Sequence, residues 1–250
     1  MKIFNRFEII NNYPSLYDPE TDSVIIADLH LGLESLMAQT GFLMPKFQLK
    51  EVKKEIEKII NKKEPEKLVI CGDIKHEFSK TTKGEREEIQ EFIEYLSDLV
   101  EKILLVKGNH DNYLIYATEK YNNVELEDQF TMKNTTFTHG HQEQQKIDTH
   151  ESKYLIIGHE HPALSLTDKV GIKEKIPCFL YGETNEENQK IIVIPAFSKL
   201  AEGSQVNLIR EKDLLSPVLK NRTNLKSLKA IAVDREAGKY KFPEIEKIKE

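Results

Sequence analysis

The chain has 250 residues, of which 39% are hydrophobic and 31% charged, and its formal net charge is −6. This length suits one large domain that can bury a substantial core. Two cysteines, Cys71 and Cys178, are too few for a disulfide-stapled miniprotein, and 11 glycines and 9 prolines exclude a collagen-like or disordered chain. No apolar run reaches the roughly 20 residues that span a membrane, and Glu8 interrupts any N-terminal signal peptide. We therefore expect a cytoplasmic protein with no membrane partner and with reduced thiols.

Short apolar runs alternate with amphipathic segments through the first 160 residues. Residues 23–27, 67–71, 103–106 and 154–157 are short and rich in β-branched side chains, which is typical of buried strands. Between them, apolar residues recur at helical spacing from Leu49 to Ile60 and from Ile89 to Val100. Strands that alternate with helices indicate crossover connections and an α/β sheet.

After residue 160 the pattern changes to short strands with little helix between them. We predict these strands at 163–167, 178–181, 190–195, 205–210 and 228–233. They indicate a second, antiparallel or mixed sheet packed on the first. We expect a domain over residues 1–215 and a C-terminal extension, residues 216–250, packed on the same domain.

Charge is unevenly distributed along the chain. Residues 199–250 carry 12 Lys and Arg against 8 Asp and Glu, whereas the first 198 residues carry 24 against 34. Lys220, Arg222, Lys226 and Lys229 lie in a stretch without any acid. This stretch is interpreted either as a surface that contacts phosphates or as an ordinary solvated surface.

Five apolar runs are each followed by polar side chains of metal-ligand type. In chain order these are Asp28 and His30, Asp73, Asn109 to Asp111, His139 and His141, and His159 and His161. Because strand ends lie side by side at one edge of an α/β sheet, we expect these residues to converge on one pocket. Oxygen and nitrogen donors without cysteine suit Mn²⁺, Fe²⁺ or Zn²⁺. Seven ligands drawn from this set exceed what one ion needs, and they fit two ions that share a bridging carboxylate, polarise a phosphoryl group and generate a hydroxide nucleophile.

This ordered set resembles the pattern of the calcineurin-like metallophosphoesterase superfamily: Asp-x-His, Gly-Asp, Gly-Asn-His-Asp, His and Gly-His-x-His. The resemblance implies a metallophosphoesterase domain built as a four-layer α/β/β/α sandwich, with two mixed sheets flanked by helices. It also implies two divalent ions, with Mn²⁺ expected and Fe²⁺, Zn²⁺ or Ni²⁺ as alternatives. The implied ligands of the first ion are Asp28, His30 and His161, those of the second are Asn109, His139 and His159, and Asp73 is the bridge. Taken singly, each residue has the alternative of a strand-end cap or a turn residue.

The resemblance further implies catalytic roles beside the ions. His110 would stabilise the transition state and protonate the leaving oxygen as general acid, and Asp111 would orient His110. We predict that His76 and His141 contact the substrate, and the alternative for His76 is a satisfied, partly buried histidine. We expect Glu160, between two ligand histidines, to point outward.

Three further segments resemble the ICC-like, SbcD-related branch of the superfamily, which includes a ligase-associated DNA-damage-response phosphodiesterase. They are residues 27–34, 72–78 and 194–207. We therefore expect a nuclease or nucleic-acid end-processing phosphodiesterase, with a role in DNA repair, whose substrate is a nucleic acid or nucleotide phosphodiester. The alternatives are a phosphoesterase of small molecules (a nucleotide, cyclic nucleotide or nucleotide-linked lipid) and a non-catalytic protein-binding scaffold. A homodimer is also considered.

Overall fold

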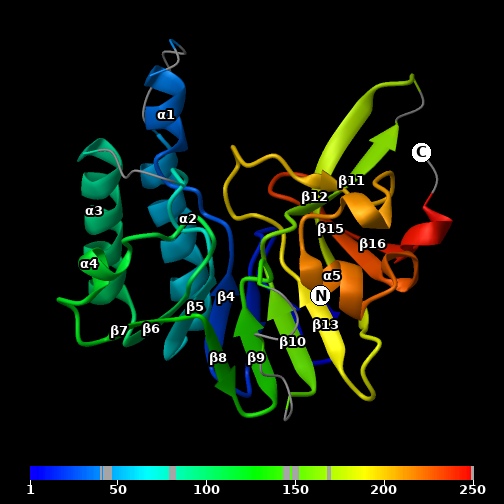
Figure 1. Ribbon diagram of the computed structural model, residues 1–250, viewed down its shortest axis with the longest axis horizontal. Coiled ribbons are helices and arrows are strands. Elements are labelled where there is room, and N and C mark those ends of the chain that lie inside the picture. The colour runs from blue at the N-terminus through cyan, green and yellow to red at the C-terminus, as the bar shows by residue number, and fades with distance from the viewer. Residues whose placement is uncertain are drawn as a thin grey trace.

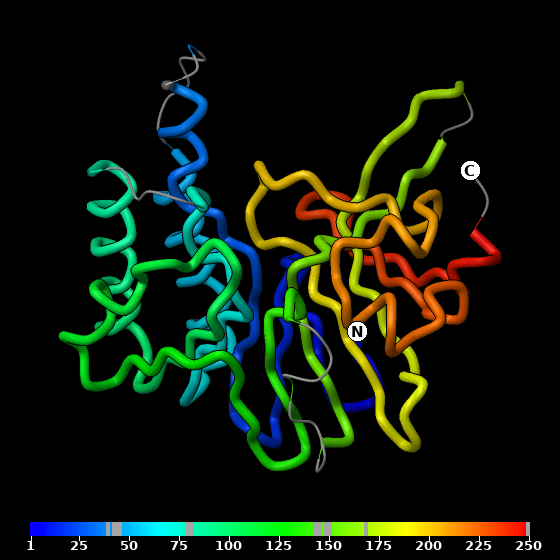
Figure 2. The backbone as a smooth tube through the Cα atoms, in the orientation of Figure 1, coloured from blue at the N-terminus to red at the C-terminus, as the bar shows by residue number. Residues whose placement is uncertain are grey.

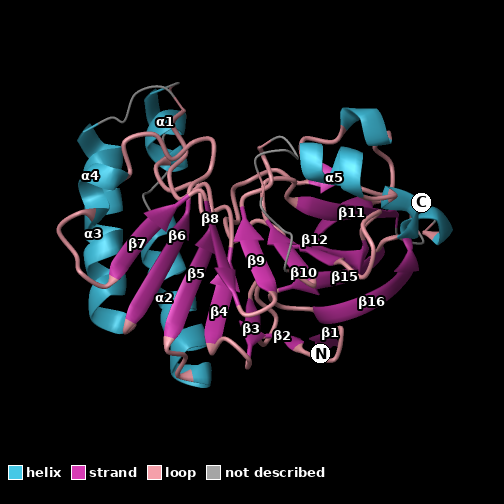
Figure 3. Cartoon of the chain, turned by 60° about the horizontal axis from the view of Figure 1, so that its bottom comes forward, coloured by secondary structure: helices cyan, strands magenta, loops and turns pink. Residues whose placement is uncertain are grey.

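Two β-sheets lie face to face in the middle of the molecule, and helices cover their outer faces (Figures 1 and 3). The computed structural model describes residues 1–39, 41, 47–78, 83–142, 147, 152–167 and 170–248. The predicted four-layer arrangement of two mixed sheets flanked by helices is confirmed. Among the described residues, no helix is long and apolar enough to cross a membrane.

The first sheet has the strand order β1-β2-β3-β4-β5-β6-β7. Its strands are β1 (Lys2–Ile3), β2 (Phe7–Ile9), β3 (Leu16–Asp18), β4 (Ser23–Ile26), β5 (Lys67–Cys71), β6 (Lys102–Val106) and β7 (Val124–Glu127). The strands from β1 to β4 pair antiparallel, and those from β4 to β7 pair parallel. Parallel neighbours end at the same edge, so the loops that follow β4, β5 and β6 lie beside one another.

Four helices accompany the first sheet: α1 (Leu33–Gln39), α2 (Gln48–Lys63), α3 (Lys83–Leu99) and α4 (Ile115–Thr118). The apolar face of α2, which includes Ile56 and Ile59, packs with Val24 and Ile26 of β4. The other side of the same sheet faces the second sheet, where Ile25 packs with Phe137 and Ile156. Because both faces of these strands are covered, their sequences are apolar throughout, as a buried parallel sheet requires.

The second sheet follows the order β14-β11-β12-β13-β10-β9-β8, and β15 pairs with both β12 and β16. Its strands are β8 (Gln129–Met132), β9 (Thr135–Thr138), β10 (Tyr154–Ile157), β11 (Pro162–Thr167), β12 (Lys173–Glu183), β13 (Lys190–Val193), β14 (Ser204–Gln205), β15 (Lys229–Asp234) and β16 (Gly238–Glu244). Helix α5 (Pro217–Arg222) packs on the outer face, where Val218 and Leu219 meet Ile157. Figure 2 shows segments far apart in the sequence, β4 in blue and β9 and β10 in green, brought together at the centre.

One sequence-based expectation needs correction, and the basic stretch keeps both of its interpretations. The strand predicted at 205–210 ends at Gln205, because the amides of Leu208 and Ile209 donate to the Gln205 carbonyl and close a turn. The basic stretch is not a uniform cationic surface. Arg222 is buried with its Nε 3.5 Å from Glu186 Oε1, and Lys229 Nζ lies 3.6 Å from Glu244 Oε1.

Residues after 215 contribute to the second sheet through β15, which pairs antiparallel with β12. The proposed boundary at residue 215 stays a prediction. Both cysteines are buried and free of disulfides, and Cys71 packs between the two sheets.

Arg6 connects the two sheets through a buried network. Its Nε and Nη2 donate to the two carboxylate oxygens of Asp18 at 2.7 and 2.6 Å, and its Nη2 also donates to Thr135 Oγ1 of β9 at 3.0 Å. The Asp18 side chain is fully buried, so its charge depends on this partner.

We predict that Arg6→Ala lowers the free energy of unfolding by about 3–5 kcal/mol, because it leaves the Asp18 carboxylate buried without a counter-charge. Denaturant unfolding measures this loss. Lys83→Ala is the control: it removes the exposed Lys83–Glu87 pair and should change stability little. Equal, small effects of the two substitutions would contradict the prediction.

Candidate metal centre

Two carboxylates lie at the carboxyl ends of neighbouring parallel strands. Asp28 follows β4 and Asp73 follows β5, and the strands are held in register beyond their ends because Asp28 N donates to Gly72 O at 3.0 Å. Both aspartates adopt left-handed backbone angles, with φ of 57° and 52°. Such strained non-glycine positions gather at functional sites, where the surrounding structure enforces them. At Asp28 and Asp73 the backbone leaves the extended conformation of the strands, and the turn sets the direction of both carboxylates.

Glycines allow the loops to approach these side chains. A Cβ atom at Gly108 would lie 2.2 Å from Asp73 Oδ1, and one at Gly72 would lie 2.2 Å from the His139 ring. Real Cβ atoms do not approach other atoms so closely, so any larger residue would displace Asp73 or His139. The glycines of the Gly-Asp and Gly-Asn-His-Asp motifs are therefore part of the site's packing.

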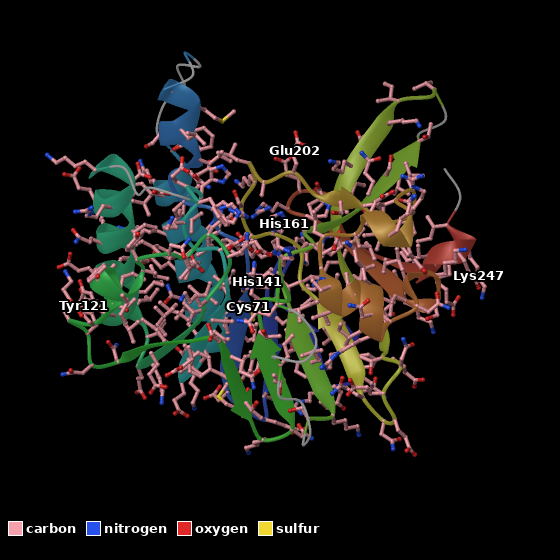
Figure 4. The ribbon with its side chains drawn as sticks, viewed as in Figure 1. Cys71, Tyr121, His141, His161, Glu202 and Lys247 are labelled. Carbon is pink, nitrogen blue, oxygen red and sulfur yellow. The ribbon has the colours of Figure 1, made fainter. Side chains whose placement is uncertain are left out.

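A first group of potential ligand atoms comes from Asp28, His30, Asp73 and His161, all within 4.8 Å of one another. His161 Nε2 lies 3.3 Å from Asp28 Oδ1 and 3.2 Å from His30 Nε2. Figure 4 shows His161 near the middle of the molecule, above Cys71 at the end of β5.

A second group comprises Asp73, His139 and His159, so Asp73 belongs to both groups. His139 Nε2 lies 3.2 Å from Asp73 Oδ2, 3.2 Å from His159 Nδ1 and 3.1 Å from Asn109 Oδ1. The structure thus brings together all seven residues predicted as metal ligands, with Asp73 in the middle. Their individual roles as ligands stay predictions.

The chemistry of these donors fits divalent cations. Imidazole nitrogens from different chain segments face one another at 3.2 Å beside buried carboxylates, an arrangement that a cation would stabilise. Backbone carbonyls hold the far side of two rings: His139 Nδ1 lies 2.9 Å from Cys71 O, and His161 Nδ1 lies 3.3 Å from Glu202 O. An imidazole that donates there directs its unprotonated Nε2 toward the metal position.

Charge and burial set the protonation of the rings. Burial lowers the pKa of His30 to about 4 and that of His159 to about 3, so both are neutral at pH 7. Burial also lowers the pKa of His139, but the charges of Asp73 and Asp28 outweigh it and raise this pKa to about 9. Burial opposes the charge of Asp73, yet His139 and His30 hold its pKa below the usual range. Without metal, a proton on His139 therefore compensates the Asp73 carboxylate.

His110 is positioned by the backbone. Its amide donates to Asp73 Oδ1 at 3.0 Å, its Nδ1 lies 2.5 Å from His76 O, and its Nε2 lies 3.9 Å from Asp73 Oδ2. We expected the Asp111 carboxylate to orient the His110 ring, but its hydrogen bonds go to backbone amides instead. The Asp111 carboxylate accepts hydrogen bonds from the amides of Ile74 at 2.9 Å and Gly108 at 2.8 Å. Asp111 thus ties together the loops that carry Asp73 and His110.

His76 and His141 lie beside the two groups. The His76 ring is stacked on His110 with a centroid distance of 5.8 Å, and the His141 ring lies 5.2 Å from His139. Burial lowers the pKa of both histidines, that of His141 to about 4. The Nδ1 atoms of both are buried without a hydrogen-bond partner among the described residues. Their proposed contact with substrate stays a prediction.

Two supporting residues had no clear signal in the sequence. Gln48, at the start of α2, donates through Nε2 to the carbonyls of Leu29 and His30, both at 3.1 Å. Glu160 does not point outward as expected but is fully buried. Its Oε2 accepts hydrogen bonds from the amides of Leu215 and Ser216 at 2.9 and 2.8 Å. Ser216 Oγ also donates to Gly140 O at 2.8 Å, so the start of α5 holds two loops of the centre.

Carboxylate, imidazole and amide donors, gathered at the ends of parallel strands and joined by one shared aspartate, define the class of metal-dependent hydrolases. The chain belongs to the calcineurin-like phosphoesterase family, whose model matches residues 23–204. It is therefore a metal-dependent phosphoester hydrolase.

Two solved structures are similar to this chain, and the first of them shares its fold. The Pseudomonas putida nuclease MPE superposes with a TM-score of 0.64 at 15% identity, covering 97% of this chain and 98% of that one. The phosphoesterase Yfce from E. coli gives a TM-score of 0.40 at 14% identity, covering 72% of this chain and 83% of that one. Among curated protein sequences, none is significantly similar to the chain.

We predict that Gly108→Ala reduces the bound metal by at least one equivalent, because the new Cβ would lie 2.2 Å from Asp73 Oδ1 and displace that carboxylate. Elemental analysis after dialysis against Mn²⁺ gives the stoichiometry. Gly238→Ala is the matched control: its φ is 112°, but a Cβ there meets nothing within 4 Å, so metal content should not change. If Gly108→Ala still bound two full equivalents of metal, the proposed packing of Gly108 against Asp73 would be contradicted.

We also predict that metal binding releases a proton from His139 at pH 7. The ring is protonated below its pKa of about 9, whereas a metal ligand must be neutral, so affinity should rise with pH between 7 and 8.5. Calorimetric titration with Mn²⁺ in buffers of different ionisation enthalpy counts the protons. A metal-binding constant that does not change with pH over this range would contradict proton release from His139.

Proposed function

We propose that this protein is a dinuclear-metal phosphodiesterase that cleaves nucleic acid. The observation that carries the proposal is the shared position of Asp73 between two groups of ligand atoms. A carboxylate that belongs to two ligand groups suits a pair of ions, and two ions suit a phosphodiester, whose attacking and leaving oxygens both need charge stabilisation.

The chain's own residues would complete the reaction. When bound, the divalent ions supply Lewis-acid activation of the phosphoryl group and of water. His110 would donate the proton to the leaving oxygen from Nε2. The His76 carbonyl supports this role, because a hydrogen bond from Nδ1 to that oxygen fixes the ring and directs Nε2 toward Asp73.

A nucleic-acid substrate is supported by the nuclease that shares this fold over nearly its whole length. The fold alone does not specify the substrate, so the site's surroundings matter. His76 and His141 flank the two ligand groups and could contact phosphates on either side of the scissile bond. We keep Mn²⁺ as the expected ion, and DNA repair as the expected process.

A second candidate, a phosphoesterase of nucleotide-like small molecules, is favoured by one cavity. It has a volume of about 370 Å³ and lies beside His161, with Lys175, Ser198 and Pro177 in its wall. This volume is in the range of small-molecule sites, and the combination of apolar walls with the basic side chains of Lys175, Lys199 and Arg235 would suit a nucleoside phosphate.

An activity screen distinguishes the two candidates. Mn²⁺-loaded protein is incubated separately with labelled single-stranded DNA, duplex DNA, RNA and bis-p-nitrophenyl phosphate. Parallel incubations with metal-free protein are the control. We expect cleavage of a polymer as well as of the small diester. Turnover of the small diester with no cleavage of any polymer would overturn the nuclease proposal in favour of the second candidate.

We predict that His110→Asn lowers kcat on bis-p-nitrophenyl phosphate by about 10²–10⁴-fold, because the variant has no proton to give the leaving oxygen. Its metal content should equal that of the unaltered protein, since His110 is not among the ligand groups. Steady-state kinetics and elemental analysis are measured on the same preparation. Near-normal turnover with full metal content would exclude His110 as the general acid.

A further inference from the structure

An exposed aromatic surface lies next to the metal centre. It consists of Phe78, Tyr113, Ile115 and Tyr116, whose exposed fractions are 53%, 64%, 47% and 67%, and we call it the aromatic shelf. The rings of Tyr113 and Tyr116 are nearly parallel, at 14° with centroids 6.4 Å apart. Single exposed apolar residues are ordinary, but a cluster rimming an active site marks an interaction surface.

The aromatic shelf is continuous with the centre. The Phe78 ring stands edge-on to the His110 ring with centroids 5.4 Å apart. Asn112 Nδ2 donates to Phe78 O at 3.1 Å and so joins the two chain segments that form the shelf. Tyr113 follows His110 by three residues, so their Cα atoms are at most about 11 Å apart. A strand with one phosphate at the metal centre reaches these rings within a few nucleotides.

The clustering is not explained by packing. Of the four exposed aromatic side chains in the described part of the chain, three belong to the shelf, and Tyr240 in β16 is the fourth. Tyr113 also has a φ of 68°, a left-handed conformation that is uncommon for a bulky residue. Because its side chain is exposed, packing in the hydrophobic core does not explain this conformation. Such strain is characteristic of segments that present a side chain for function.

Electrostatics alone do not account for binding of a polyanion. The chain carries a net charge of −6, and two cations of its basic stretch, Arg222 and Lys229, lie close to glutamates. Stacking of bases on aromatic rings strengthens binding by roughly 5- to 150-fold per base and needs no positive field. Stacking requires unpaired bases, because a duplex hides the faces of its bases within its own stack.

We propose that the aromatic shelf stacks unpaired bases of a single strand whose scissile phosphate lies at the metal centre. This inference rests on the proposed function and makes it more specific: the substrate is single-stranded nucleic acid or a single-stranded end. Phe78 takes the base nearest the reacting phosphate, and Tyr113 and Tyr116 take bases farther along the strand.

The chain contains no tryptophan, which makes stacking directly measurable. Tyr113→Trp and Tyr116→Trp each place a single tryptophan on the shelf, which is excited selectively over the tyrosines, and Tyr240→Trp places one on an exposed site elsewhere. The probe is a twelve-residue oligothymidylate, and each variant also carries His110→Asn and is loaded with Mn²⁺, so that the metal centre is present while cleavage is slow on the timescale of the titration. We expect quenching in both shelf variants and none in Tyr240→Trp. An abasic strand of the same length, which keeps the phosphates, should not quench.

A kinetic experiment tests the shelf in the Mn²⁺-loaded enzyme. Tyr113→Leu and Tyr116→Leu should each lower kcat/KM for the oligothymidylate about tenfold or more relative to kcat/KM for bis-p-nitrophenyl phosphate, which has no base. Tyr113→Trp should restore the polymer activity that Tyr113→Leu loses. Tyr240→Leu, outside the site, should leave both activities at the level of the unaltered protein.

The outcomes separate this inference from the proposed function. Quenching without cleavage of any polymer supports the shelf and overturns the nuclease proposal. Polymer cleavage that the leucine variants leave unchanged, or equal quenching by the abasic strand, overturns the shelf and leaves the nuclease proposal standing. Preference for duplex over single-stranded DNA in the binding titration also overturns the shelf.

Discussion

The centre of this molecule depends on two carboxylates, Asp28 and Asp73, buried side by side where water cannot solvate them. Backbone amides stabilise part of their charge: His159 N donates to Asp28 and His110 N to Asp73. Histidines provide the rest, and one of them keeps a proton in the absence of metal. Removing such charges from water costs free energy, and a bound cation would offset this electrostatic cost.

The topology explains how this concentration of charge arises. The loops after β4, β5 and β6 meet because those strands are parallel neighbours, and the loops after β9 and β10 reach the same place because the second sheet packs face to face on the first. Each contributes a side chain from a turn that leaves its strand abruptly. The hydrophobic core between the sheets therefore fixes the spacing of the polar centre above it.

The sequence predicted the strands best where both faces of the strand are buried in the fold. The strands β4, β5, β6 and β10 are continuous apolar runs, and the ligand types that follow them marked the centre. The short strands β1 to β3 and the half-exposed β16 lack such a run, so nothing distinguished them from loops. Asp111, Gln48 and Glu160 were misjudged or missed for a different reason. Their partners are backbone groups, whose positions exist only in the folded chain.

The contacts made by Ser216 have a consequence for the last part of the chain. Its amide and hydroxyl join the loops that carry His139, His159 and His161, so the C-terminal segment supports the loops of the candidate centre. A homologue that exchanged this segment for another would have to supply an equivalent pair of donors. Without them, the buried Glu160 carboxylate would lose a hydrogen bond that stabilises its charge, and the Gly140 carbonyl would lose its donor.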